Sequence, residues 1–351
     1  MRRTAGFYYF CFSALLGSAL AAGCVGFSTP DWIGGFSQEY PNDRYLLGVG
    51  SGESRKAAED NALGALSRIF RADVRQQTRE LEKYFQRDAG RRTLISHSVN
   101  IDQLTTVSSD RVLEDAKIEA VWVHPKTGRY YALALIDRVH AETALRDRLR
   151  ELDGAARAYL DPSRKSVDKI QAVRGLHQAV KTLLLRETTN ADLRIISPSG
   201  RGMPAEVNLA EVSQDLQDFL KNHLRIGVEV AGPHAEEIRG AFLQELTEKG
   251  FAVIGGGPDG GPSPAPPDLL IKGTVGFQTD EKADPPFVHW DASFQILETE
   301  TGRVLGGLVK SGREGHLTSA EAESRAVRAV QKEFGEDLTL NLTDLLYGES
   351  D

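Results

Sequence analysis

The sequence predicts an α+β protein in which two small helix-on-sheet domains are joined by a helical hairpin. Long stretches with apolar residues at helical spacing alternate with shorter stretches rich in β-branched residues. Two short turns, at 124–129 and 298–303, each join a pair of alternating apolar segments, as in β-hairpins. The 351 residues, 40% hydrophobic and 26% charged, have the composition of globular domains, and the length suggests two or three of them.

The first 23 residues have the layout of a secretory signal peptide. Met1-Arg2-Arg3 is a short basic start, Phe7 to Leu20 is mostly apolar, and small residues precede Cys24. The apolar run is shorter than the roughly 20 residues that a membrane-spanning helix needs. We therefore expect 1–23 to be removed and 24–44, rich in glycine, proline and turn formers, to serve as a tether.

The segment Leu20-Ala21-Ala22-Gly23-Cys24 resembles a bacterial lipobox. The resemblance implies a diacylglyceryl group on the Cys24 thiol, and acyl chains such as palmitate that anchor the protein in a membrane. The leucine stands one place earlier than usual. The alternative is ordinary cleavage after Ala21, which would leave the protein unanchored in the periplasm. Val25 replaces the aspartate that retains some lipoproteins at the inner membrane, which favours a periplasm-facing position on the outer membrane.

The first folded domain is predicted over 45–138. Ser54 is expected to cap its long helix, and Trp32 is expected to pack on the domain rather than bind a ligand, because large aromatic side chains mostly serve burial. The predicted elements, in chain order, are a strand over 45–49, a glycine turn at Gly48, Gly50 and Gly52, a helix to about Phe85, and strands over 93–108, 118–123 and 130–136.

The helical hairpin is predicted over 139–190, with a break at Asp161-Pro162-Ser163, because Pro162 suits the first turn of a second helix. Its two helices are expected over 138–160 and 163–188. The segment 190–224 is ambiguous: Leu193–Ile196 reads as a possible strand and 209–220 as a possible helix.

The second domain is predicted over 225–347, with the element order β-α-β-β-β-β-α. This order predicts a five-stranded mixed sheet with two helices. The strands are expected over 226–230, 251–254, 269–277, 288–297 and 304–310, and the helices over 235–249 and 319–346.

Charge and cysteine content exclude several functions. The formal net charge is −8, and removal of Arg2 and Arg3 leaves 40 basic against 50 acidic residues. A net negative surface repels nucleic-acid phosphates, so we expect no nucleic-acid partner. Cys24 would be the one cysteine left after processing, so neither an intrachain disulfide nor a thiolate metal site is expected.

The glycine-rich segments do not support phosphate binding. In Gly48-x-Gly50-x-Gly52 the third glycine comes one place early for a dinucleotide fingerprint, and no Gly-Lys-Ser/Thr follows. We expect these glycines to lie where side chains would clash. The loop 255–267 has no lysine, and we interpret it as a flexible excursion, or alternatively as a segment that docks a partner.

No catalytic, cofactor or metal site is expected from the remaining residues. Asp110 and Glu114 are interpreted as solvated acids, and nothing combines a nucleophile, a base and an orienting group. No pair of histidines has metal-ligand spacing. The histidines are His97, His124, His140, His177, His223, His234, His289 and His316.

Three segments of the first domain carry a family resemblance. They are Pro30-Asp31-Trp32, the run Tyr45–Gly52 followed by Ser54, Ala57 and Ala58, and the run Tyr131–Arg138. Together they resemble the LPP20 lipoprotein family over about 29–150. The resemblance implies an outer-membrane-associated lipoprotein without known catalysis. A related domain occurs in the flagellar assembly protein T. The C-terminal element order is similar to the TolB N-terminal type of domain, which recurs in CsgG-like secretion proteins and acts as an adaptor.

These features favour a lipid-anchored, non-catalytic scaffold or adaptor that binds protein partners in an envelope assembly. Two alternatives stay open. One is an enzyme acting on envelope polymers, for which the compartment and the abundant carboxylates are the support. The other is a binder of small ligands such as lipids or sugars, with its pocket between the domains.

Overall fold

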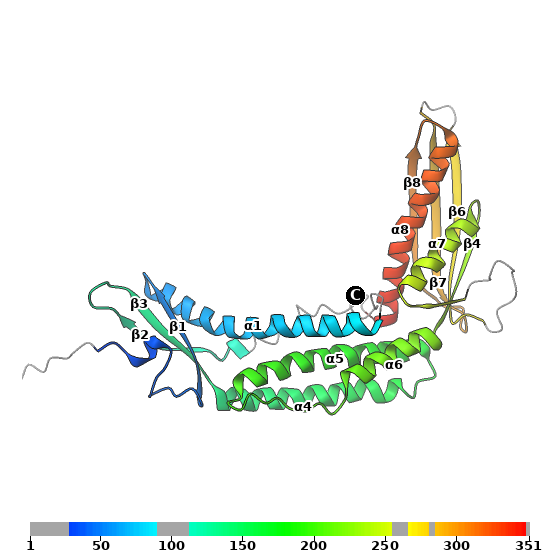
Figure 1. Ribbon diagram of the computed structural model, residues 1–351. Coiled ribbons are helices and arrows are strands. Elements are labelled where there is room, and N and C mark those ends of the chain that lie inside the picture. Colours follow the sequence, from blue (N-terminus) through cyan, green and yellow to red (C-terminus); the bar gives the residue numbers. More distant parts are fainter. Residues whose placement is uncertain (1–27, 90–111, 255–265, 281–284, 349–351) are drawn as a thin grey trace, which may run out of the picture.

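The computed structural model describes residues 28–89, 112–254, 266–280 and 285–348. An N-terminal sheet lies at one end, a helical hairpin runs along the middle, and a C-terminal domain stands at the other end, so that the molecule is L-shaped in Figure 1. The predicted α+β class is confirmed, and these described residues form one sheet of three strands and one of five.

The N-terminal domain packs helix α1 (Arg55–Ala89) on a three-stranded antiparallel sheet. The strands β1 (Tyr45–Gly52), β2 (Lys117–Val123) and β3 (Tyr130–Asp137) lie in the order β1-β3-β2, and the predicted hairpin is formed by the last two. Ser54 Oγ accepts a hydrogen bond from Ala57 N, as expected of the cap. The predicted strand over 93–108 falls outside the described residues.

The three glycines of β1 lie in the strand itself, so the prediction that they form a turn is wrong. A Cβ at Gly48 would lie 2.5 Å from Ala62 O, and one at Gly50 would lie 2.1 Å from Ala62 N. Gly52 faces Ala57 with a corresponding distance of 2.7 Å. The expected clash is therefore confirmed, but its cause is the backbone of α1, which presses on alternate positions of a regular strand.

The helical hairpin consists of α4 (Arg138–Ser163) and α5 (Lys169–Ile196). Pro162 lies within the last turn of α4, so the prediction that it begins the second helix is wrong. Asp168 begins α5 instead, because its carboxylate accepts hydrogen bonds from Ile170 N (2.8 Å) and Gln171 N (3.0 Å). Leu193–Ile196 is the last turn of α5 and not a strand.

The two ends of the hairpin belong to two different hydrophobic cores. Near its open end, Leu145 and Leu149 of α4 and Leu193 of α5 pack into the core of the N-terminal domain. Near its closed end, Leu160 and Leu176 pack into the core of the C-terminal domain. The hairpin therefore bridges the domains, and helix α6 (Leu209–Asn222), which contacts α5, leads the chain into the second one.

A buried ion pair fastens the middle of the hairpin. The Arg186 side chain of α5 is 1% exposed, and its Nε lies 3.1 Å from Asp153 Oδ1 of α4. Its Nη2 donates to the carbonyl oxygens of Met203 (2.9 Å) and Pro204 (2.7 Å) in the segment that precedes α6. Arg186 thus joins three parts of the chain at one point.

The C-terminal domain has the predicted five-stranded mixed sheet, in the order β5-β4-β6-β7-β8. The first three of these strands pair in parallel, and the pairs β6–β7 and β7–β8 are antiparallel. Helices α7 and α8 pack on this sheet. The elements are β4 (Arg225–Ala231), α7 (Ala235–Glu248), β5 (Ala252–Ile254), β6 (Leu269–Asp280), β7 (Phe287–Glu298), β8 (Val304–Gly315) and α8 (Ser319–Tyr347). Of the predicted loop 255–267, residues 255–265 fall outside the described residues.

Candidate functional site

The predicted lipid attachment residue, Cys24, falls outside the described residues, but the segment that follows it is held on the N-terminal domain. The short helix η1 (Asp31–Gly34) contacts β3, and Trp32 is only 6% exposed, which confirms its packing role. Gln38 N donates to the Asp31 carboxylate (2.8 Å) and Ser37 Oγ donates to it as well (3.1 Å). The hydrogen bond from Gln38, followed by that from Ser37, lowers the pKa of Asp31. Residues 28–44, which we call the strap, are therefore held against the N-terminal domain.

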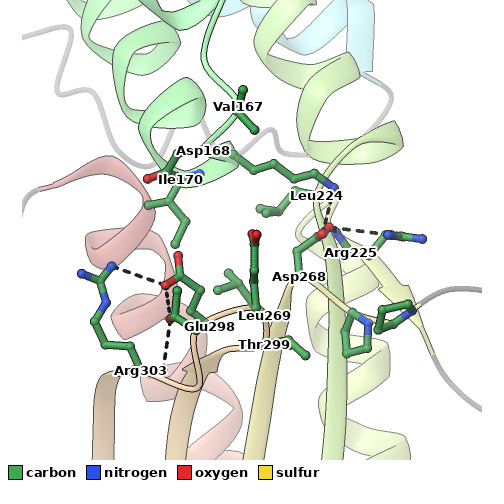
Figure 2. Close-up of a pocket in the computed structure, with 15 residues that line it drawn as sticks. Val167, Asp168, Ile170, Leu224, Arg225, Asp268, Leu269, Glu298, Thr299 and Arg303 are labelled. Atoms are coloured by element: carbon green, nitrogen blue, oxygen red, sulfur yellow. Dashed lines mark hydrogen bonds and ion pairs between the residues drawn. The ribbon is translucent and has the colours of Figure 1, made fainter.

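A cleft of about 820 Å³ lies where the closed end of the hairpin meets the C-terminal domain. Figure 2 shows Asp168, Ile170 and Leu224 on one side of it and Leu269, Glu298 and Thr299 on the other. The remaining lining residues are Val167, Lys169, Arg225, Pro266, Pro267, Asp268, Glu300, Thr301 and Arg303. The cleft is therefore built from the elbow of the hairpin, the starts of β4 and β6, and the β7–β8 turn.

Most of the charged side chains that line this cleft pair with one another. Lys169 Nζ lies 2.8 Å from Asp268 Oδ1, while Arg225 donates its backbone N–H to Asp268 Oδ2 (2.8 Å) and places its Nε 3.7 Å from the same oxygen. Glu298 accepts a hydrogen bond from Thr301 and pairs with Arg303 at 3.7 Å. Lys169 and Asp268 therefore form a charged joint between the hairpin and the C-terminal domain, whereas the Glu298–Arg303 pair lies within the β7–β8 turn.

A second joint between the same two parts is largely apolar. Arg174 of α5 donates from Nη2 to the carbonyl oxygen of Leu345, near the end of α8, at 2.8 Å. The His177 and Tyr347 rings, both almost fully buried, stack with centroids 3.9 Å apart and an interplanar angle of 15°. Burial lowers the pKa of His177 to about 4, with a smaller contribution from the charge of Lys181.

This second joint is expected to weaken in acid. Since the folded state holds the pKa of His177 below its ordinary value of 6.5, the unfolded chain binds more protons between pH 6.5 and about 4. The contribution of His177 to the free energy of unfolding is fully present above pH 6.5. It falls by about 3 kcal/mol in all as the pH drops toward 4. Urea unfolding at a series of pH values measures it, and a His177→Phe variant should lose this part of the slope. An unchanged slope in that variant would contradict the assignment.

The acidic residues and histidines for which no site is expected do not converge on one site in the described residues. Glu114 is exposed, whereas Asp110 and His97 fall outside the described residues. His124 Nδ1 accepts hydrogen bonds from the backbone of its own turn. His234 immediately precedes α7, and its Nε2 lies 2.9 Å from Oε1 of Glu323 in α8. Within the described ranges, no group of three or more His, Cys, Asp or Glu residues could hold a metal ion. The same residues contain no helix with the length and hydropathy to cross a membrane.

Comparison with known proteins bears on the N-terminal domain. Residues 30–137 match the LPP20 lipoprotein family. The resemblance predicted over 29–150 is thereby confirmed, and the LPP20 match begins within the strap and ends with β3. The similarity of the C-terminal domain to the TolB N-terminal type stays a prediction. None of the curated proteins matches this sequence.

Three solved structures show the level of similarity. The secreted protein HP1454 from Helicobacter pylori is 18% identical, with a TM-score of 0.40, and the match covers 85% of this chain and 98% of that one. A minor lipoprotein from Acinetobacter baumannii is 12% identical, with a TM-score of 0.26 and coverages of 34% and 91%. Lipoprotein GNA1162 from Neisseria meningitidis is 16% identical, with a TM-score of 0.24 and coverages of 32% and 99%.

Proposed function

We propose that this LPP20-domain protein is anchored to the outer membrane through lipid on Cys24 and faces the periplasm. There it acts as a non-catalytic adaptor, holding its C-terminal domain away from the membrane. The observation that carries the proposal is the hairpin whose ends are built into two cores. The match to a lipoprotein family and the signal-like N-terminus support the anchor and an association with the cell envelope.

The dimensions of the molecule suit a spacer. Helix α4 has 26 residues and α5 has 28, so each spans about 40 Å at 1.5 Å per residue. Cys24 precedes Ser28, the first described residue, by four positions, which even a fully extended chain covers in at most about 14 Å. A lipid on Cys24 would therefore keep the N-terminal domain at the bilayer, with the C-terminal domain at the far end of the arm.

The C-terminal domain offers a surface on which a partner could bind. Alternate residues of β7, such as Trp290 and Phe294, are buried beneath the helices, whereas His289, Asp291 and Gln295 on the opposite face are exposed. In the described part of the chain β8 pairs with β7 alone, so its other edge is open to an added strand. These features support an adaptor role for this domain.

The anchor is tested by replacing each cysteine in turn. We expect Cys24→Ser to move the protein out of the detergent-extracted membrane fraction, and mass spectrometry of the wild type to show a lipidated N-terminal cysteine. Cys11→Ser is the matched control, because Cys11 lies in the segment expected to be cleaved, and it should leave the protein in the membrane. An unmodified N-terminus beginning at Ala22, recovered by osmotic shock, would refute the anchor.

The adaptor role is tested in the same cells with photo-crosslinkers. Val309 on β8 is 77% exposed, and Tyr159 on the hairpin is 43% exposed. Crosslinks to a discrete protein should form from position 309 and be rare from position 159. Equal, diffuse labelling from both positions would argue against a partner-binding C-terminal domain.

A further inference from the structure

The turn between β2 and β3 differs in charge from the rest of the chain. Residues 120–131 include Lys126 and Arg129 but no acidic residue, although acidic residues outnumber basic ones by 50 to 42 overall. The side chains of Lys126 and Arg129 are exposed. The β2–β3 turn is therefore a basic tip on an acidic protein. Glu53 follows β1 at the same end of the sheet, where Gly52 pairs with Tyr130, and the exposed Arg55 and Lys56 follow Glu53.

Aromatic side chains accompany the basic ones. The Trp122 ring is partly exposed and lies 5.7 Å from the Tyr131 ring and 5.5 Å from the His124 ring, between centroids. Val123 beside it is 42% exposed. Aromatic rings combined with lysine and arginine are typical of segments that lie at the headgroup level of a membrane.

The position of the tip fits a bilayer contact. Figure 1 shows the β2–β3 turn at the end of the molecule opposite α8, with η1 beside the same sheet. Because Cys24 reaches at most about 14 Å beyond the strap, a lipid there would hold this end at the membrane surface.

Lys126 is not required by the turn itself, although both turns have an arginine after the glycine, Arg129 in one and Arg303 in the other. The β7–β8 turn has the same hydrogen bonds: Gly128 N donates to His124 O (2.9 Å), and Gly302 N donates to Glu298 O (2.8 Å). Both glycines have φ of 70°. The second turn carries Glu300 where the first has Lys126, so a Glu-Thr-Gly-Arg sequence forms this turn equally well.

We propose that the β2–β3 tip contacts an anionic lipid surface through Lys126, Arg129 and Trp122. The proposal rests on the anchoring proposed above, since the lipid on Cys24 supplies the proximity. The contact would orient the helical hairpin, because an anchor and a second membrane contact on the same domain fix the direction in which the hairpin points away from the bilayer. The partner is a surface of phosphatidylglycerol-type headgroups, to which each nearby basic residue adds attraction.

The test uses the full-length lipidated protein in vesicles of phosphatidylethanolamine and bromine-labelled phosphatidylglycerol, with two independent readouts. Flotation reports anchoring, and quenching of tryptophan fluorescence reports the tip, because Trp32 and Trp290 are only 6% and 2% exposed. We expect wild-type quenching that Trp122→Phe removes. The double variant K126E/R129E should lower the ratio of docked to free tips at least about tenfold while flotation is unchanged.

Two comparisons make the result decisive. Glu300→Lys, in the matching turn of the C-terminal domain, should leave the quenching as it is, and about 0.5 M salt should weaken it. Protein that floats without quenching, or quenching that K126E/R129E leaves intact, would overturn the tip contact while the anchor stands. If the protein fails to float on neutral vesicles, the anchor fails. Salt-sensitive binding to anionic vesicles that depends on Lys126 and Arg129 would then still support the tip, and its absence would overturn both proposals.

Discussion

Replacing Gly50 by valine is expected to unfold the N-terminal domain. A Cβ at this position would lie 2.1 Å from Ala62 N and 2.4 Å from Ala58 O, and both are backbone atoms of α1. No side-chain rotation relieves a clash with backbone, so either the helix leaves the sheet or the strand leaves its register with β3. We expect the free energy of unfolding to fall by about 3 kcal/mol or more, which is at the upper end for overpacking in a core. Urea unfolding followed by circular dichroism, together with limited proteolysis of residues 45–138, measures it.

Gly64→Ala is the matched control. Gly64 lies in α1, the helix that Gly50 faces, and the end of the Arg68 side chain, at 3.7 Å, is all that lies near its Cβ position. Removing a glycine from a helix interior stabilises by about 0.5–1 kcal/mol, so this variant should be slightly more stable than the wild type. A Gly50→Val protein with wild-type stability would show that α1 does not pack on β1 as the structure has it.

These glycines also show how far the sequence could predict the fold. A run with glycine at 48, 50 and 52 resembles a turn in composition, yet its period of two is that of a strand with one face against a neighbour. The choice between the two depends on whether a helix backbone approaches the strand. That approach is a tertiary contact between β1 and the first turns of α1. The sequence therefore shows the alternation of glycines, but it does not show whether they form a turn or a strand packed against a helix.

The hairpin break and the cleft illustrate two other limits. Pro162 and Asp168 are both plausible starts for α5, and the structure uses Asp168 because its carboxylate caps the helix, while the last turn of α4 accommodates the proline. The cleft depends on Lys169 meeting Asp268, which is 99 positions away in the chain. Periodicity defines helices and strands, but it does not indicate which charged side chains will meet across a joint.

Removing the Arg186 side chain is expected to destabilise the helical hairpin that the proposed function requires. Asp153 is fully buried, and in Arg186→Ala its carboxylate would lose the guanidinium that lies 3.1 Å away. The carbonyl oxygens of Met203 and Pro204 would lose their donor as well. Breaking a buried ion pair by removing one partner costs about 3–5 kcal/mol, because the remaining charge stays buried without compensation. Chemical unfolding should show a loss of this size.

Two further variants separate burial from charge. Arg150→Ala removes an arginine from the same hairpin, but its pair with Asp147 is exposed (63% and 62%), so the change should stay below about 1 kcal/mol. The double variant R186M/D153L replaces both buried charges by apolar groups and should recover most of the loss, since no unpaired charge is left behind. If Arg186→Ala were as mild as Arg150→Ala, water would have to reach Asp153, and the hairpin would be a looser connection than a spacer between membrane and partner requires.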